Sequence, residues 1–228
     1  MTLRWAEKGP LHFTRERAVE PGAAGFLVVD VQYDCCARGE GSYVDARPTH
    51  PDPAKEAYLA RVETSVLPAI RRVQDAVRAA AGEVLFTVIE SLTLDGRDRS
   101  LDHKLSDMHV PRGSRLAEVI DSVGPVGDEI VLPKTSSGVF NSTNIEYVLR
   151  NLGVEYLIVA GVFTDQCVDM AVRDAADRGF MVTLVEDGCA GSTMEKHVNA
   201  LKAFSGYCRI RTSNDLVAEI AARRAAAE

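Results

Sequence analysis

Short, continuous apolar runs recur along the chain and alternate with segments of helical periodicity. The first run is Gly25-Phe-Leu-Val-Val-Asp30, and five more follow at residues 83–89, 129–132, 155–160, 180–186 and about 207–211. Such runs are typical of strands buried on both faces of a parallel sheet. Alternation of these strands with helices predicts an α/β fold, a Rossmann-like three-layer sandwich with a mostly parallel six-stranded sheet and helices on both faces.

The segments between the apolar runs predict the helices and the domain organisation. Apolar positions spaced close to 3.6 residues predict helices over residues 54–81, 114–123, 142–151, 165–178, 193–204 and 214–227. Residues 1–24 lack this alternation, so we expect an N-terminal arm that lies on a single domain of residues 25–228. The polar segment 91–112 is long for a connection inside a compact domain, which favours a binding loop or lid.

Composition excludes several classes of function. With 33 acidic and 26 basic residues, the net charge of -7 argues against a nucleic-acid partner. No apolar run approaches the roughly 20 residues that span a bilayer, and the N-terminus has no apolar signal core. An odd count of five cysteines does not suggest a disulfide framework. We therefore expect a cytoplasmic protein that acts on a small molecule, without a membrane partner.

Three residues stand where the chemistry of such a sheet is expected. Ligands of open α/β sheets bind outside the carboxyl ends of the strands. Asp30 ends the first apolar run, Lys134 follows the third, and Cys167 opens the helix after the fourth. Each also has an ordinary alternative, as a turn cap, a solvated lysine and a packed small residue respectively. Together they supply a base, a cation and a nucleophile, which are the groups that thiol catalysis requires.

The cysteines are expected to differ in role. Cys167 is predicted in a first helical turn, where unpaired N–H groups and the helix dipole favour the thiolate. Cys35 and Cys36 are adjacent, so a disulfide between them would be strained, and we expect both in the pocket wall or the core. Cys189 and Cys208 are expected to be buried without a chemical role.

The residues around these positions resemble the isochorismatase-like cysteine hydrolases. That family combines a strand ending in Asp-x-Gln, a Lys after a later strand, and Gly-x-x-Thr-x-x-Cys before a helix. The chain contains Asp30-Val-Gln32, Leu132-Pro-Lys134 and Gly161-Val-Phe-Thr-Asp-Gln-Cys167. The resemblance covers about residues 25–205 and leaves the arm and the last helix outside it.

The resemblance implies a role for each matched residue. It makes Asp30 the base, Lys134 its charge partner and Cys167 the nucleophile, without a cofactor. It also implies an oxyanion hole formed by the backbone N–H groups of Phe163 and Cys167, and a cis peptide bond between Val162 and Phe163.

Departures from the family patterns narrow the expected activity. Metal-dependent nicotinamidases carry Asp-x-His after the second strand, where this chain has Glu90-Ser-Leu-Thr, and His103 and His109 lack that spacing. We therefore expect no metal site. Vinyl-ether-cleaving isochorismatases generally lack the nucleophile, so Cys167 disfavours that activity. The segments 34–45 and 134–141 are similar to those of biuret hydrolases and ureidoacrylate amidohydrolases, although Cys35 replaces a common Phe.

The expected function is a cysteine-dependent amidohydrolase that cleaves a C–N bond of a small ureide or carbamoyl compound. The reaction would pass through a thioester and release ammonia. The alternatives are a nicotinamidase-like carboxamidase, a lactam hydrolase, a vinyl-ether-cleaving isochorismatase and a non-catalytic scaffold member. We expect a homo-oligomer, either a dimer or a tetramer.

Four further residues are candidates for substrate binding. Glu90 follows the second predicted strand, where it could accept bonds from ureido N–H groups or form a salt bridge in the loop. Arg97, like Lys104 in the same polar segment, could hold a carboxylate or remain solvated. Asn141 could orient the lysine or cap the helix that follows. Gln32 is included because it belongs to the Asp-x-Gln motif.

Overall fold

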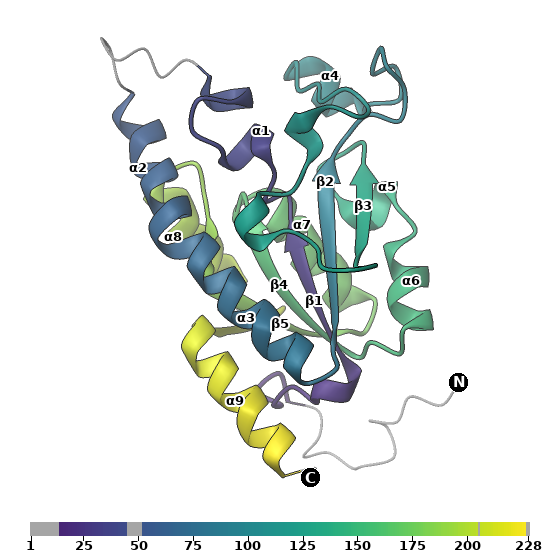
Figure 1. The fold of residues 1–228 in the computed structure, drawn as a ribbon, viewed down its shortest axis with the longest axis vertical. Coiled ribbons are helices and arrows are strands. Elements are labelled where there is room, and N and C mark those ends of the chain that lie inside the picture. Colours follow the sequence, from purple (N-terminus) through teal and green to yellow (C-terminus); the bar gives the residue numbers. More distant parts are fainter. Residues whose placement is uncertain (1–13, 45–51, 205, 227–228) are drawn as a thin grey trace.

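A parallel sheet of six strands forms the centre of the computed structural model, which describes residues 14–44, 52–204 and 206–226 (Figure 1). The strands are β1 (Ala24–Val29), β2 (Glu83–Ile89), β3 (Ile130–Lys134), β4 (Tyr156–Val162), β5 (Met181–Ala190) and β6 (Arg209–Arg211). They lie in the order β3-β2-β1-β4-β5-β6, and every neighbouring pair is parallel. The α/β fold class predicted from the sequence is therefore confirmed.

The strands form where the apolar runs predict them, although the edge strand β3 is only partly covered. Every residue of β1 and β4, the two central strands, is buried. β5 continues to Ala190, beyond the predicted end at residue 186. The extension occurs because a register shift lets Cys189 and Ala190 pair with the end of β4.

Helices cover both faces of the sheet (Figure 1). α2 (Pro53–Arg61), a π-helical turn (Val62–Val66) and α3 (Leu67–Ala79) follow without a break, as predicted for residues 54–81. α3 and α9 (Ser213–Ala225) pack together on one face. The remaining helices are α1 (Tyr33–Cys36), α4 (Leu101–Leu105), α5 (Val139–Ser142), α6 (Ile145–Asn151), α7 (Cys167–Asp177) and α8 (Met194–Ala203). Of these, α7 packs against β4 and β5 and contacts α5.

The prediction of a helix over residues 114–123 is wrong. The segment forms two short 3₁₀ turns, Arg115–Ala117 and Asp121–Val123. Between them the backbone is extended, because Tyr33 N–H donates to Glu118 O and Ile120 N–H donates to Val31 O, both at 3.0 Å. These bonds to the residues after β1 replace the bonds that a helix would make.

The described part of the N-terminal arm, residues 14–23, lies on the domain. Val19 is fully buried, and its N–H donates to Glu219 Oε1 of α9 at 2.9 Å. β1 begins at Ala24, one residue before the predicted domain boundary. The rest of the predicted arm, residues 1–13, lies outside the described residues.

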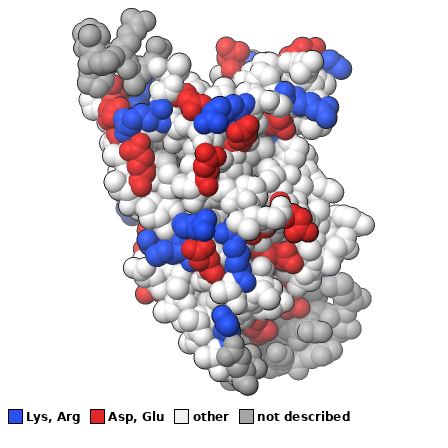
Figure 2. Space-filling view, in the orientation of Figure 1, with Lys and Arg blue, Asp and Glu red and all other residues white. Residues whose placement is uncertain are grey.

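Acidic and basic side chains are interspersed on the face drawn in Figure 2. Across the described residues, many acidic and basic side chains are joined in ion pairs, such as Arg38 with Glu56 at 2.6 Å and Arg72 with Asp187 at 3.4 Å. A surface that binds nucleic acid instead gathers its basic groups, so this face does not have that character. Among the described residues, no helix is long and apolar enough to cross a membrane.

Candidate active site

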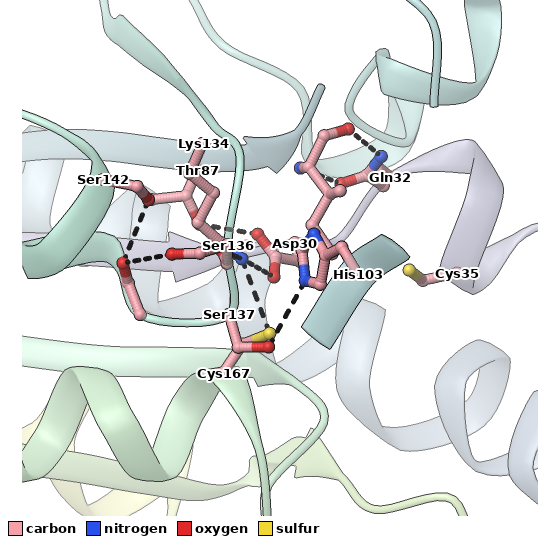
Figure 3. Close-up of polar contacts among 12 residues, drawn as sticks. Asp30, Gln32, Cys35, Thr87, His103, Lys134, Ser136, Ser137, Ser142 and Cys167 are labelled. Atoms are coloured by element: carbon pink, nitrogen blue, oxygen red, sulfur yellow. Dashed lines mark hydrogen bonds and ion pairs between the residues drawn. The ribbon is translucent and has the colours of Figure 1, made fainter. Parts of the chain in front are cut away.

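Asp30, Lys134 and Cys167 meet at the carboxyl edge of the sheet (Figure 3). Asp30 directly follows β1, Lys134 ends β3, and Cys167 begins α7 after β4. β1 lies between β2 and β4, so the order of the strands reverses there. Such a reversal opens a crevice at the carboxyl ends of the strands, where ligands of α/β sheets bind.

The Lys134 ammonium links the other two side chains. Its Nζ lies 2.8 Å from Asp30 Oδ2 and 3.5 Å from Cys167 Sγ, and it donates to Ser136 O at 2.9 Å. Residue exposure is 0% for Lys134, 1% for Asp30 and 5% for Cys167. The three groups therefore interact where bulk water does not screen them.

Each carboxylate oxygen of Asp30 faces a different partner. Thr87 Oγ1 donates to Oδ1 at 2.8 Å. Oδ2 faces Lys134 but accepts no well-aligned hydrogen bond from the described residues. The backbone of Asp30 is left-handed, with a φ of 53°, a conformation that costs a non-glycine residue about 1–3 kcal/mol. This strained backbone presents the carboxylate to Lys134 and Cys167.

Burial controls the protonation of the nucleophile. Burial and the Asp30 carboxylate raise the pKa of the Cys167 thiol to about 12, and Lys134 offsets this only in part. Burial therefore opposes the thiolate that a helix start alone favours. Burial opposes the charge of Lys134, but Asp30 and Cys167 raise its pKa above the ordinary value. Attack by Cys167 thus requires a base, and Asp30 Oδ2 is available.

The end of β4 requires glycine, and the turn that follows it exposes backbone donors. A Cβ on Gly161 would lie 2.1 Å from Val29 O, so β4 approaches β1 there too closely for any other residue. The Val162–Phe163 peptide bond is cis, as the family resemblance implied. Neither the N–H of Phe163 nor that of Cys167 donates to a described backbone or side-chain acceptor. Both are available to an oxyanion.

His197 of α8 forms a hydrogen bond with Thr164, which lies in the turn between β4 and α7. Thr164 Oγ1 lies 2.8 Å from His197 Nδ1, and Arg61 Nη2 lies 3.0 Å from His197 Nε2. Arginine can only donate, so Nε2 accepts and Nδ1 carries the hydrogen that Thr164 receives. Burial, then Arg61, lowers the pKa of His197 to about 4, which keeps the ring neutral. α8 thereby anchors the turn that carries the nucleophile.

A cavity of about 590 Å³ opens onto Asp30 and Cys167. Its walls include Cys35 of α1, Met108 of the polar segment, and Phe163 beside the nucleophile. A second hollow of about 500 Å³ is lined by Phe180 and Tyr207, among others, and by none of these residues. The first cavity is therefore the candidate substrate site.

The polar segment 91–112 forms one wall of this cavity, as a binding loop would. Ser91 N–H donates to Val110 O, and Ser100 N–H donates to Thr135 O, each at 2.9 Å. These bonds fix α4 over the carboxyl edge of the sheet, where His103 lines the cavity.

His103 was missed as a site residue by the sequence reasoning, which weighed it only as a metal ligand. Its Nε2 lies 3.4 Å from Ser137 Oγ, and its buried Nδ1 has no hydrogen-bond partner among the described residues (Figure 3). Its place in the long polar segment was the signal that could have identified it.

None of the four predicted substrate-binding residues lines the cavity. Two of them, Gln32 and Glu90, instead form hydrogen bonds with backbone groups of the fold. Gln32 donates through Nε2 to Ile89 O at 3.0 Å and to Leu116 O at 2.9 Å, and its Oε1 accepts from Ile89 N–H at 2.6 Å. Its amide therefore braces the end of β1. Glu90 Oε1 accepts the Gly113 N–H at 2.7 Å, which closes the base of the polar segment.

The other two candidates also lie away from the cavity. The Arg97 side chain is 73% exposed and pairs with Asp95 at 3.0 Å. Asn141 lies inside α5, whereas Asn144 precedes α6 and the Ile145 N–H bonds to Thr143 Oγ1. The predicted capping role of Asn141 is therefore wrong, because a separate short helix intervenes.

The five cysteines are free and buried. Cys35 lies on the cavity wall and Cys36 Sγ lies 3.8 Å from Tyr58 Oη, so both predicted positions are confirmed. Cys189 and Cys208 are buried, also as predicted. Within the described ranges, no three His, Cys, Asp or Glu side chains gather into a group that could hold a metal ion.

Comparisons with known proteins match the chain to one family. A family model described as Isochorismatase domain matches residues 24–215. YddQ of Bacillus subtilis (strain 168), an uncharacterized isochorismatase family protein, is 35% identical over 78 residues, which are 34% of this chain and 43% of YddQ. The match thus spans less than half of that relative.

A longer match and a solved structure agree with the family model. The ureidoacrylate amidohydrolase RutB of Agrobacterium fabrum (strain C58 / ATCC 33970) is 26% identical over 185 residues, 74% of this chain and 76% of RutB. A cysteine hydrolase from Pseudomonas syringae pv. phaseolicola 1448A has a TM-score of 0.76 at 20% identity, covering 91% of this chain and 97% of that one. At 20% identity, the similarity to the Pseudomonas syringae structure shows a shared fold.

Proposed function

The chain belongs to the isochorismatase family, and we propose that within this family of hydrolases it is a cysteine-dependent amidohydrolase. The observation that carries the proposal is the contact of Lys134 Nζ with both Asp30 and Cys167 at the edge of the cavity. A buried thiol beside a carboxylate and a cation suits nucleophilic attack on a carbonyl carbon.

In the first half of the proposed reaction, the thiol becomes an acyl carrier. Asp30 Oδ2 takes the proton of Cys167 as Sγ bonds to the substrate carbonyl carbon. The carbonyl oxygen becomes an anion, which the N–H groups of Phe163 and Cys167 receive. Asp30 then gives the proton to the leaving nitrogen, the C–N bond breaks, and a thioester remains.

The second half of the reaction regenerates the thiol. Asp30, again ionised, takes a proton from water as the water oxygen attacks the thioester carbon. The C–S bond breaks, and Asp30 returns the proton to Cys167 Sγ. Lys134 stays charged throughout, because its position stabilises the carboxylate and then the departing sulfur.

The substrate proposed is a small ureide or other carbamoyl compound. RutB, which matches three quarters of this chain, is a ureidoacrylate amidohydrolase. Vinyl-ether cleavage does not need a thiol nucleophile, and a non-catalytic scaffold would not need the buried contacts among Asp30, Lys134 and Cys167. The proposal therefore favours amide hydrolysis over both.

An ammonia-release screen tests the proposed function. Wild-type protein is incubated with biuret, N-carbamoyl amino acids, nicotinamide and small lactams, and ammonia or ring opening is measured. We expect ammonia from carbamoyl compounds, and none from Cys167→Ser, whereas Cys208→Ser keeps wild-type activity as a matched control. If only plain carboxamides are hydrolysed, the protein is a carboxamidase and the proposed substrate class is wrong. Activity in Cys167→Ala would overturn the mechanism.

A further inference from the structure

The cavity wall is acidic. Asp102, Asp165 and Asp169 line it in addition to Asp30, whereas no Arg or Lys is among its described lining residues. Lys134, the nearest buried cation, is already held by Asp30 and by the carbonyl of Ser136. A substrate that enters the cavity therefore meets carboxylates before it meets any available cation.

Two of these carboxylates lack a compensating charge. Asp169 pairs with Arg173 at 2.8 Å along α7. Asp102 and Asp165 form no ion pair within the described part of the chain, and Asp165 Oδ1 is buried without a hydrogen-bond partner there. Like charges repel, more strongly at the half-buried Asp165 than at the exposed Asp102, so a carboxylate on the substrate would be disfavoured. The buried Oδ1 of Asp165 lies toward Gly191, where an added Cβ would come within 3.2 Å of it.

The neutral polar groups of the wall suit an uncharged amide. His103 is 3% exposed and lines the cavity with a free Nδ1, while its Nε2 lies 3.4 Å from Ser137 Oγ. Burial, then Lys134, lowers the pKa of His103, so its ring is neutral and offers one donor and one acceptor. A carbamoyl group presents N–H donors and a carbonyl acceptor, which match His103 and Ser137.

We propose that this cavity selects uncharged carbamoyl compounds and discriminates against those that carry a carboxylate. The inference rests on the proposed amidohydrolase function and assigns its substrate class. Asp102 and Asp165 repel the anion, and His103 with Ser137 binds the neutral amide.

The test compares two probes that differ only in charge. N-carbamoylglycine carries a carboxylate, and N-carbamoylglycinamide has a carboxamide in its place. Binding of each to Cys167→Ser is measured by calorimetry, so that turnover does not interfere. We expect the neutral probe to bind about tenfold or more tightly than the acid. In the wild type, kcat/KM for loss of the carbamoyl nitrogen should follow the same order.

Variants locate the origin of the selectivity. Two variants, each made in Cys167→Ser, are Asp165→Asn and Asp102→Asn. Each should lower the ratio of neutral-probe to acid-probe affinity about threefold or more, because each removes one negative charge from the wall. Asp121→Asn removes the same charge from an exposed residue that does not line the cavity, and it should leave the preference unchanged. His103→Leu should weaken binding of the neutral probe about fivefold or more, since it removes a hydrogen-bonding side chain.

The inference and the proposed function fail in different measurements. Equal or tighter binding of the acid, or a preference that Asp165→Asn and Asp102→Asn do not alter, would overturn the charge selection even if both probes release ammonia. Absence of Cys167-dependent ammonia release from every carbamoyl compound would instead remove the proposed function, and with it the substrate class.

Discussion

Lys134 Nζ lies 2.8 Å from Asp30 Oδ2, and both side chains are almost completely buried. The pair joins the ends of β1 and β3, which β2 separates in the sheet. Removal of one partner from a buried ion pair leaves an uncompensated charge. The same contact therefore contributes to folding and to the chemistry proposed for Cys167.

Lys134→Met should lower both stability and activity. We expect the free energy of unfolding to fall by about 3–5 kcal/mol, because Asp30 is left buried without its cation. The double variant Asp30→Asn/Lys134→Met should be destabilised less than the sum of the single variants. Urea unfolding of all four proteins measures this coupling.

The activities of the same proteins should also be non-additive. Each single variant should lose about 100-fold or more in kcat/KM, and the double variant should be little worse than the worse single one. Losses that multiply would show that Asp30 and Lys134 do not act in one site.

Alkylation should reveal the base that serves Cys167. With a pKa raised by burial to about 12, the thiol reacts through proton transfer rather than as a standing thiolate. We expect iodoacetamide to label Cys167 ahead of the other cysteines, with Asp30→Asn slowing that labelling about tenfold or more. Peptide mass spectrometry identifies the site, and Asp121→Asn serves as the control. Unchanged labelling of Cys167 in Asp30→Asn would exclude Asp30 as its base.

Activity should not depend on a metal ion. Asp-x-His does not follow the second strand, where Glu90 instead bonds to Gly113. Prolonged treatment with a chelator should leave kcat/KM unchanged, and elemental analysis should find no stoichiometric zinc or iron. Loss of activity that zinc or iron restores would contradict this prediction and favour the nicotinamidase alternative.

The stability of the protein should decrease as the pH is lowered, because of His197. Burial and Arg61 lower the pKa of His197 from the ordinary 6.5 to about 4, so the unfolded chain binds a proton that the folded protein resists. Stability is then fully present above about pH 6.5 and decreases as the pH falls toward 4. His197→Gln should show a shallower decrease in Tm over this range. An equal slope in both proteins would show that His197 does not titrate in this way.

The sequence by itself determined the sheet and the positions of the reactive residues. Apolar runs and helical periodicity are local patterns, and parallel strands place their carboxyl ends at one edge. Asp30, Lys134 and Cys167 each stand at such an end, so the sequence placed them at one edge of the sheet, and the strand order then brought them together. The Gly-x-x-Thr-x-x-Cys motif likewise indicated the turn between β4 and the helix that begins at Cys167.

The tertiary structure decided which polar residues face the substrate and how the nucleophile is protonated. Gln32 and Glu90 follow strand ends as Asp30 does, yet backbone groups from residues 89, 113 and 116 bond to their side chains. His103 reaches the cavity because Ser100 N–H bonds to Thr135 O, a contact that no local pattern encodes. Hydrogen-bond partners and burial come from segments distant in the chain, so side-chain roles and pKa values depend on the packed fold.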